Sequence, residues 1–178
     1  MERRLKGFTI IETMLVIAIG GLILAMVFIA LPGVMAGQRD AERQTDAEML
    51  VKKIRDYQAN NGRGALPTGI GPIDSETDAT QANSWGYFYQ NELDDSFADP
   101  SLGNKYTLKV VNCTSDTSAT VGINCTDASL PGEDGDLSGT MYVVKNASCD
   151  GAQAVYSAKA RDFVVVYKLE RGVLCANS

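Results

Sequence analysis

One acidic side chain interrupts an otherwise uncharged stretch near the start of the chain. Glu12 lies in the segment GFTIIETMLVIAIGGLILAMVFIALPGVMA, residues 7–36, and no residue from Thr13 to Ala36 carries a charge. A lone carboxylate in an apolar helix costs about 3 kcal/mol to insert into a membrane, and such residues are functional by default. Glu12 is therefore the first candidate functional residue.

Four cysteines form the second candidate group: Cys113, Cys125, Cys149 and Cys175. An even number of cysteines beyond an apolar anchor is typical of an oxidising exterior and predicts two disulfides. Three pairings are formally possible, and we favour Cys113–Cys125 with Cys149–Cys175 because each closes a local loop. A zinc site is the alternative, but the chain has no C-x-x-C spacing and no histidine.

The sequence carries no catalytic constellation. Without histidine there is no Ser-His or Cys-His pair, and no glycine-rich phosphate loop follows a strand. The acidic segment DASLPGEDGD, residues 127–136, does not match the EF-hand pattern, so a solvated loop is favoured and calcium binding by its oxygens is the alternative. We therefore predict a protein that is not an enzyme, with no catalytic residue, no cofactor and no metal site.

Length and charge set further limits. The 178 residues suffice for one anchor and one domain, and the formal net charge is −6. An acidic surface argues against broad binding to a phosphate backbone, so nucleic acid is not a predicted partner.

One long helix is expected from Thr9 to about Asn60. Its first half is apolar on all sides and, at about 1.5 Å per residue, long enough to cross a hydrocarbon core of roughly 30 Å. Its second half is amphipathic, because apolar residues recur at spacings of three and four. These residues are Ala47, Leu50, Ile54 and Tyr57.

Three residues weaken the apolar half of this helix. Gly20 and Gly21 lower helix propensity, and Pro32 removes one backbone hydrogen bond, so a kink or a looser turn is expected there. Two interpretations remain open: a membrane proline tolerated by local adjustment, or a segment built to lose helix.

The remaining residues predict a sheet domain. Residues 63–83 have the composition of a loop, and the aromatic run SWGYFYQNEL, residues 84–93, fits a short helix or a strand. Trp85, Tyr87, Phe88 and Tyr89 in this run are expected to pack in the core. Strands are expected at residues 105–112, 140–145, 153–159, 162–169 and 173–175. The fold class is thus α+β, a long N-terminal helix packed against a C-terminal antiparallel sheet.

The basic leader MERRLKG and the sequence that follows it identify a family resemblance. KGFTIIETMLVIAIGGLILA resembles the processing motif and N-terminal helix of type IV prepilins and pseudopilins. The resemblance implies that a prepilin peptidase cuts between Gly7 and Phe8 and methylates the new Phe8 amine. The segment DPSLGNKY, residues 99–106, resembles the D-P-x-G-x-x-Y turn before the first sheet strand of these proteins.

This resemblance implies a domain organisation of four parts. Residues 1–7 are the leader, 8–36 the transmembrane and assembly helix, 37–60 its amphipathic continuation, and 61–178 an extracytoplasmic sheet domain. The subunit is expected in the cytoplasmic membrane first, and on the cell surface after assembly.

The resemblance also implies a function, a structural subunit of a type IV pilus serving adhesion, twitching motility or DNA uptake. Its partners would be copies of itself, possible other pilins, the prepilin peptidase, a membrane platform protein, and assembly ATPases that act through that platform. The first alternative is a pseudopilin of a type II secretion or competence system. The Cys149–Cys175 loop resembles the disulfide-bounded C-terminal region of pilins and favours the pilus. The second alternative is an anchored binding domain that never polymerises.

In such a filament Glu12 is expected to pair with the Phe8 amine of a neighbouring subunit and so to set the axial register. Pairing with the amine of its own chain is the alternative. Pilins are thought to lose helix on assembly in about the region from Gly20 to Pro32.

Overall fold

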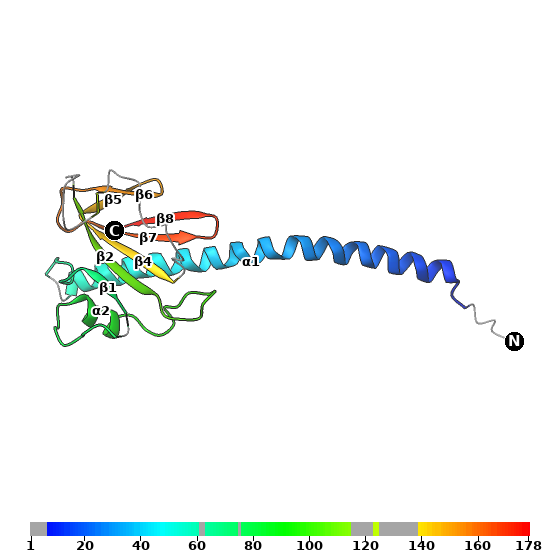
Figure 1. Ribbon diagram of the computed structural model, residues 1–178, viewed down its shortest axis with the longest axis horizontal. Helices are drawn as coiled ribbons and strands as arrows, with labels where there is room; N and C mark the ends of the chain where they lie inside the picture. Colours follow the sequence, from blue (N-terminus) through cyan, green and yellow to red (C-terminus); the bar gives the residue numbers. More distant parts are fainter. Residues whose placement is uncertain (1–6, 61–62, 75, 115–122, 125–138) are drawn as a thin grey trace. The chain divides into compact units, whose positions relative to one another are not determined.

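The computed structural model describes residues 7–60, 63–74, 76–114, 123–124 and 139–178. Its elements are two helices and eight strands in these ranges (Figure 1). The chain divides into two compact units, Met1–Gln38 and Arg39–Ser178. Helix α1, Ile10–Asn60, contributes residues to both.

The first unit consists of the apolar part of α1 and the residues before it. Every side chain from Phe8 to Met35 is exposed. The helix passes through Gly20, Gly21 and Pro32 without interruption, so the expected long helix is confirmed and no break occurs at Pro32. Loss of helix on assembly concerns another state of the protein and stays a prediction. Within the described residues, α1 is the one helix long and apolar enough to cross a membrane.

In the second unit, the predicted apolar stripe of α1 is confirmed as one side of the core. Ala47, Leu50 and Ile54 are fully buried, and Tyr57 is 3% exposed. Burial of a large apolar side chain, such as Leu50 or Ile54, contributes about 1.5–3 kcal/mol to the stability of the fold. This packing stabilises the helix over residues 39–60. Among the described residues of their own unit, residues 10–38 have no such packing.

The aromatic run forms helix α2, Trp85–Asn91. The Ser84 hydroxyl caps it by accepting a hydrogen bond from the Tyr87 amide at 3.1 Å, which favours a helix over a strand. Trp85 and Phe88 are buried as expected, and the Phe88 ring meets Tyr57 edge to face at 5.7 Å. Tyr89 is also buried, whereas Tyr87 is only half-buried.

The main sheet has the strand order β1-β2-β4-β7-β8, with β3 paired to β2 beside this path (Figure 1). Its predicted strands are β2 (Thr107–Thr114), β4 (Thr140–Lys145), β7 (Phe163–Leu169) and β8 (Gly172–Asn177). Leu108 and Val110 of β2 are fully buried, together with Tyr106 just before the strand, as their alternation predicted.

Three strands were not predicted: β1 (Gly71–Ile73), β3 (Ile123–Asn124) and β5 (Ala147–Asp150). They are two to four residues long, too short to show a period. The sheet is mostly antiparallel, but β2 and β4 run parallel, with Thr107 opposite Thr140 and Asn112 opposite Lys145. A parallel pair needs a long connection. The 25 residues between β2 and β4 supply one here.

A second, two-stranded sheet pairs β5 with β6 (Gln153–Tyr156). The predicted disulfide Cys149–Cys175 is present and joins β5 to the edge strand β8, with the Cα atoms 5.8 Å apart. Cys113 is buried at 1% exposure. Its predicted partner Cys125 lies outside the described residues, as does the acidic segment 127–136.

Truncating the apolar stripe should destabilise the second unit. Ile54→Ala removes three buried carbon atoms from the interface of α1 with the sheet, and we expect the free energy of unfolding to fall by about 2–5 kcal/mol. Urea unfolding of the detergent-solubilised protein measures this loss. Lys52→Ala, at an exposed position of the same helix, is the control and should change it little. Equal losses in the two variants would contradict the assigned packing.

Candidate functional site

The helix start is closed by a reciprocal cap between Thr9 and Glu12. The Glu12 Oε2 atom accepts hydrogen bonds from the Thr9 amide at 3.0 Å and from the Thr9 hydroxyl at 2.8 Å. The Glu12 amide donates to the Thr9 hydroxyl at 3.4 Å. This is the capping box T-x-x-E, which satisfies amide groups that the first helical turn leaves without partners.

The cap gives Glu12 a partner that the sequence analysis did not consider. The pattern T-x-x-E before an apolar run was readable in the sequence. Both hydrogen bonds go to Oε2, and within the described residues Oε1 accepts none. The carboxylate is therefore oriented by its own chain and keeps one oxygen available to an outside donor.

The predicted processing junction precedes this cap. Gly7 and Phe8 are exposed, Phe8 at 88%, and both lie before the helical residues. A Cβ atom built on Gly7 would have no heavy atom within 4 Å. Packing among the described residues therefore does not require glycine at position 7.

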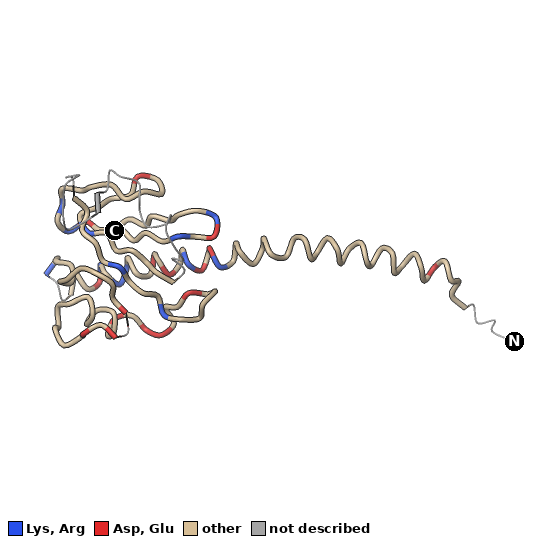
Figure 2. Tube along the Cα trace, in the orientation of Figure 1, with Lys and Arg blue, Asp and Glu red and all other residues tan. Residues whose placement is uncertain are grey.

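The apolar residues after the cap form a surface that no described residue of the chain covers. Figure 2 shows no charged position along the helix between Glu12 and the charges that begin at Arg39. Exposed apolar surfaces of this extent are interaction sites for membranes or proteins. The largest exposed side chains include Ile10, Ile17, Phe28 and Ile29, each more than 70% exposed.

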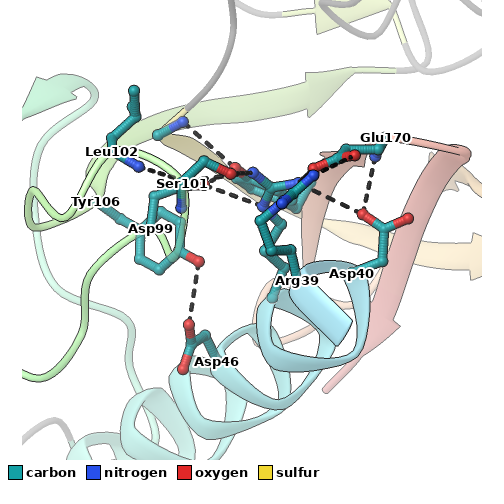
Figure 3. Close-up of polar contacts among 11 residues, drawn as sticks. Arg39, Asp40, Asp46, Asp99, Ser101, Leu102, Tyr106 and Glu170 are labelled. Atoms are coloured by element: carbon teal, nitrogen blue, oxygen red, sulfur yellow. Dashed lines mark hydrogen bonds and ion pairs between the residues drawn. The ribbon is translucent and has the colours of Figure 1, made fainter. Parts of the chain in front are cut away.

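A second polar arrangement lies in the second unit, where α1 meets the sheet (Figure 3). Arg43 is 4% exposed and Asp99 is fully buried. Arg43 Nε donates to Asp99 Oδ2 at 3.1 Å, and Nη2 donates to Asp99 Oδ1 at 3.3 Å. The Tyr167 hydroxyl of β7 donates to Asp99 Oδ2 at 2.7 Å. One carboxylate thus joins the long helix to a central strand of the sheet.

The turn that carries Asp99 is shaped around the same carboxylate. Asp99 Oδ1 accepts from the Ser101 amide at 2.7 Å and the Leu102 amide at 3.1 Å. The Ser101 hydroxyl accepts from Arg43 Nη2 at 2.6 Å. This turn has one residue more between Pro100 and Gly103 than the pattern it resembles. Asp99 therefore acts as both the organiser of its turn and the partner of the helix.

An outer layer of charges closes the arrangement at its exposed side. Arg39 donates to the two carboxylate oxygens of Glu170 at 2.6 and 3.0 Å. The Glu170 amide donates to Asp40 at 2.9 Å, and Arg43 lies 3.4 Å from both Asp40 and Glu170. Because Glu170 belongs to the turn between β7 and β8, these contacts fix that turn to residues 39–43 of the helix (Figure 3). We call Arg39, Asp40, Arg43, Asp99, Tyr167 and Glu170 the helix–sheet clasp.

The electrostatics of the clasp favour its charged form. Burial alone raises the pKa of Asp99, but hydrogen bonds from Arg43, Tyr167 and the Ser101 amide outweigh it and hold the pKa below its usual value. The Arg39 hydrogen bond likewise lowers the pKa of Glu170. For Arg43, burial is the largest single influence and lowers the pKa, but the hydrogen bonds with Asp99 and the nearby charges of Asp99 and Glu170 together outweigh it and raise the net pKa.

No local sequence pattern identifies the clasp as a unit. Two features of the sequence bear on the clasp. Arg43 lies four residues before Ala47, on the apolar stripe, and Asp99 precedes Pro100 in a predicted turn. The stripe predicts burial of whatever lies at position 43, and a buried arginine needs an anion. Nothing in the local sequence shows that the anion lies 56 residues away.

Neither arrangement has the components of a catalytic centre. Across the described ranges no three His, Cys, Asp or Glu side chains are placed to hold a metal ion. The cap and the clasp hold backbone and charge in fixed positions within one chain.

Comparison with known proteins gave one family. Residues 3–28 match the model of the prokaryotic N-terminal methylation motif. This range contains Gly7, Phe8, Thr9 and Glu12 and ends within the apolar part of α1. No curated protein and no solved structure matched the chain.

Neutralising the buried carboxylate of the clasp should cost stability at neutral pH. Asp99→Asn removes the one fully buried counter-charge of Arg43 and leaves only Asp40 and Glu170 at 3.4 Å, and we expect a loss of about 3 kcal/mol in the free energy of unfolding at pH 7. The unfolded pKa of an aspartate is about 3.9, and the folded pKa lies below it. The contribution of the charge is thus complete above about pH 4 and is lost as the pH falls through the folded pKa.

The stability difference between wild type and Asp99→Asn should therefore narrow progressively below about pH 4, as measured by urea unfolding at a series of pH values. Asp95→Asn makes the same change of charge at an exposed position nearby and should cost little. A difference that stays constant in acid would show that the charge of Asp99 is not what holds the clasp.

Proposed function

Because the chain belongs to the family defined by the prokaryotic N-terminal methylation motif, the type IV pilins and pseudopilins, we propose that it is a structural subunit of a type IV pilus. Members of this family are structural proteins and not enzymes. In the proposed function, the mature subunit waits in the cytoplasmic membrane and is then extracted into a surface filament. Residues 8–36 of neighbouring subunits pack as the filament core, and the sheet domains coat it.

One observation carries this proposal. The apolar side chains of α1 up to Met35 are exposed, and Glu12, the single carboxylate among them, is oriented by Thr9. Side chains from Phe8 to Met35 are exposed in the isolated chain, so they need lipid or other helices around them. A permanent anchor needs only the apolar residues. Glu12 makes insertion less favourable, and its bonds with Thr9 occupy only one of its two carboxylate oxygens, which supports a further partner for its charge.

The proposed partner of Glu12 is the Phe8 amine of a neighbouring subunit. Thr9 holds one carboxylate oxygen, and the other accepts no hydrogen bond within the described residues. In a dry bundle of helices an unpaired Glu12 would be strongly unfavourable. Pairing removes this penalty only at one axial offset, so the charge sets the register of the subunits more than it adds affinity.

The choice of pilus over pseudopilus rests on the end of the chain. The Cys149–Cys175 disulfide closes a loop of 26 residues that contains β6, β7 and the clasp residue Glu170. This resembles the disulfide-bounded C-terminal region of pilins and supports the pilus. A pseudopilin of a secretion or competence system shares the N-terminal motif and is the second candidate for that reason. Adhesion, twitching motility and DNA uptake are the roles open to such a pilus.

The proposal includes a set of partners. The prepilin peptidase would cut between Gly7 and Phe8, where the chain is exposed and glycine has no packing role. Copies of the same chain would form the filament, and other pilins could join it. A membrane platform protein would extract the subunit, driven by ATPases on the cytoplasmic side.

Removal of the leader is the first test of this function. We expect the mature protein to begin at N-methylated Phe8, which intact-mass measurement and N-terminal sequencing of surface-exposed protein would detect. Gly7→Leu should leave an uncut precursor in the membrane without changing the fold, because position 7 has open space around it. Gly7→Ala adds a single methyl group and serves as the graded control. A mature chain that begins at Met1 would rule out the proposal.

A second test separates the charge of Glu12 from its role as a helix cap. Glu12→Gln keeps an oxygen that can accept from Thr9 but has no charge to pair with an amine, so we expect few or no filaments when it is the only pilin in the cell. Thr9→Val removes the capping hydroxyl and keeps the charge, at a cost of about 1 kcal/mol to the helix, and should reduce filaments less.

Filament yield by electron microscopy and sheared-protein blots, with leader removal and membrane insertion as controls, measures both variants. If Glu12→Gln assembles normally, or if Thr9→Val is the more damaging change, the charge of Glu12 does not direct assembly.

A further inference from the structure

The second unit carries a pocket of about 480 Å³ that is separate from the clasp and contains charged residues of only one sign. It is lined by Arg55, Gln58, Ala59, Arg63, Gly64 and Arg161. These residues come from the last turns of α1, from the segment that follows it, and from the turn before β7. Three guanidinium groups around one pocket are unexpected in a chain with net charge −6.

Among the described residues, none of these arginines has a carboxylate partner within 4.0 Å. In the described ranges, the ion pairs within 4.0 Å involve Arg39 and Arg43 but not Arg55, Arg63 or Arg161. The neighbouring carboxylates Asp56 and Asp162 do not line the pocket. Asp162 accepts a hydrogen bond from the Ser157 hydroxyl at 2.7 Å. All three arginines are exposed, so solvent weakens the repulsion among their charges, and the fold still brings them to one pocket.

The pocket is nevertheless held together by a buried side chain. Gln58 is 6% exposed and donates from Nε2 to the Arg161 carbonyl at 3.2 Å. Its own carbonyl accepts from the Gly64 amide at 2.7 Å. Gln58 thus joins the end of α1 to the segments that carry Gly64 and Arg161. The backbone of the fold therefore brings the three arginines to one pocket.

The backbone around the pocket lies close to the Arg161 side chain and has an uncommon conformation at Arg63. Gly64 has φ +85°, and a Cβ atom there would lie 2.9 Å from Arg161 Cζ, so a larger residue would displace that guanidinium. Arg63 has φ +48°, in the left-handed region where a non-glycine residue is uncommon. The Arg55 guanidinium lies 5.8 Å from the centre of the Phe163 ring, a cation–π contact that limits its positions.

We propose that this pocket is a binding site for a phosphate group. A guanidinium presents its N–H donors as a rigid fork that matches two oxygens of a phosphate, and three of them can surround one tetrahedral dianion. A bound dianion would also remove the repulsion among the arginines. The volume accepts either free inorganic phosphate or the phosphate of a small ester. The site acts in the single subunit and does not depend on filament formation.

Titration with inorganic phosphate and with glycerol 3-phosphate tests this site. The probe is the mature full-length protein in detergent, observed by NMR of the arginine Nε–H groups and by calorimetry, with sodium chloride at equal ionic strength as the blank. We expect saturable shifts at three arginine signals. Tighter binding of the ester assigns the site to a phosphate carried on a larger molecule, and tighter binding of inorganic phosphate assigns it to the free ion.

Variants distinguish this pocket from the general charge of the protein. Arg161→Gln and Arg63→Gln should each weaken binding by about tenfold, as expected for loss of a charge-assisted hydrogen bond. Lys109→Gln removes one positive charge from an exposed position of β2 and should leave the affinity unchanged.

One further pair of variants keeps all three arginines. Ala59→Glu places a carboxylate at the pocket and should abolish binding, whereas Ala59→Gln, similar in size and neutral, should bind nearly as well as wild type. The proposal is overturned if phosphate gives no saturable shift up to about 10 mM, a free energy of about −2.7 kcal/mol. It is also overturned if chloride reproduces the shifts, or if Lys109→Gln weakens binding as much as the arginine variants.

Discussion

The structure depends on the need to remove one apolar helical surface from water. Helix α1 exposes the large side chains between Phe8 and Met35, and each would gain about 1.5–3 kcal/mol from burial. No other described residue of the chain supplies that burial. A bilayer can do so for a single copy, and the helices of other copies can do so in a filament. In the proposed function, Glu12 favours the filament because a neighbouring subunit can supply a partner for its charge.

Residues 39–60 of the same helix bury their apolar surface within their own unit. Their apolar stripe is covered by the sheet, and the clasp adds polar contacts of defined geometry to this packing. Arg43 and Asp99 would each be costly to bury alone, and together with Tyr167 they leave no charge without a partner. The clasp therefore specifies which turn of the helix lies against which part of the sheet. This role is separate from any net contribution of the clasp to the free energy of folding. The Cys149–Cys175 disulfide adds a covalent constraint between β5 and the edge strand β8.

Sequence patterns predicted the parts of this fold that have a period. The stripe from Ala47 to Tyr57, the alternation in β2, and the continuous apolar strand β7 all occur where expected, because each buries a face that repeats along the chain. The short strands β1, β3 and β5 were missed because too few residues carry the pattern. The parallel pairing of β2 with β4 was missed because it depends on where the long connection returns, which no local pattern records.

The candidate sites divide in the same way. Glu12 was found because a charge in an apolar segment is a local contrast, and its Thr9 partner, three residues earlier, was also readable. Arg43 and Asp99 are joined across 56 residues, and the pocket of Arg55, Arg63 and Arg161 joins three separate segments. Each arginine and aspartate alone looks like an ordinary surface residue. Only the fold shows that one pair is buried and that one trio surrounds a pocket.

The central claim is that Glu12 sets the register of a filament whose core is the apolar part of α1. Cryo-electron microscopy of filaments sheared from the cell surface tests this most directly. The account predicts a core built from residues 8–36 of this chain, with the Glu12 carboxylate within about 4 Å of the Phe8 amine of a neighbouring subunit. A filament in which Glu12 pairs with the amine of its own chain, or surface filaments that lack this chain, would contradict it.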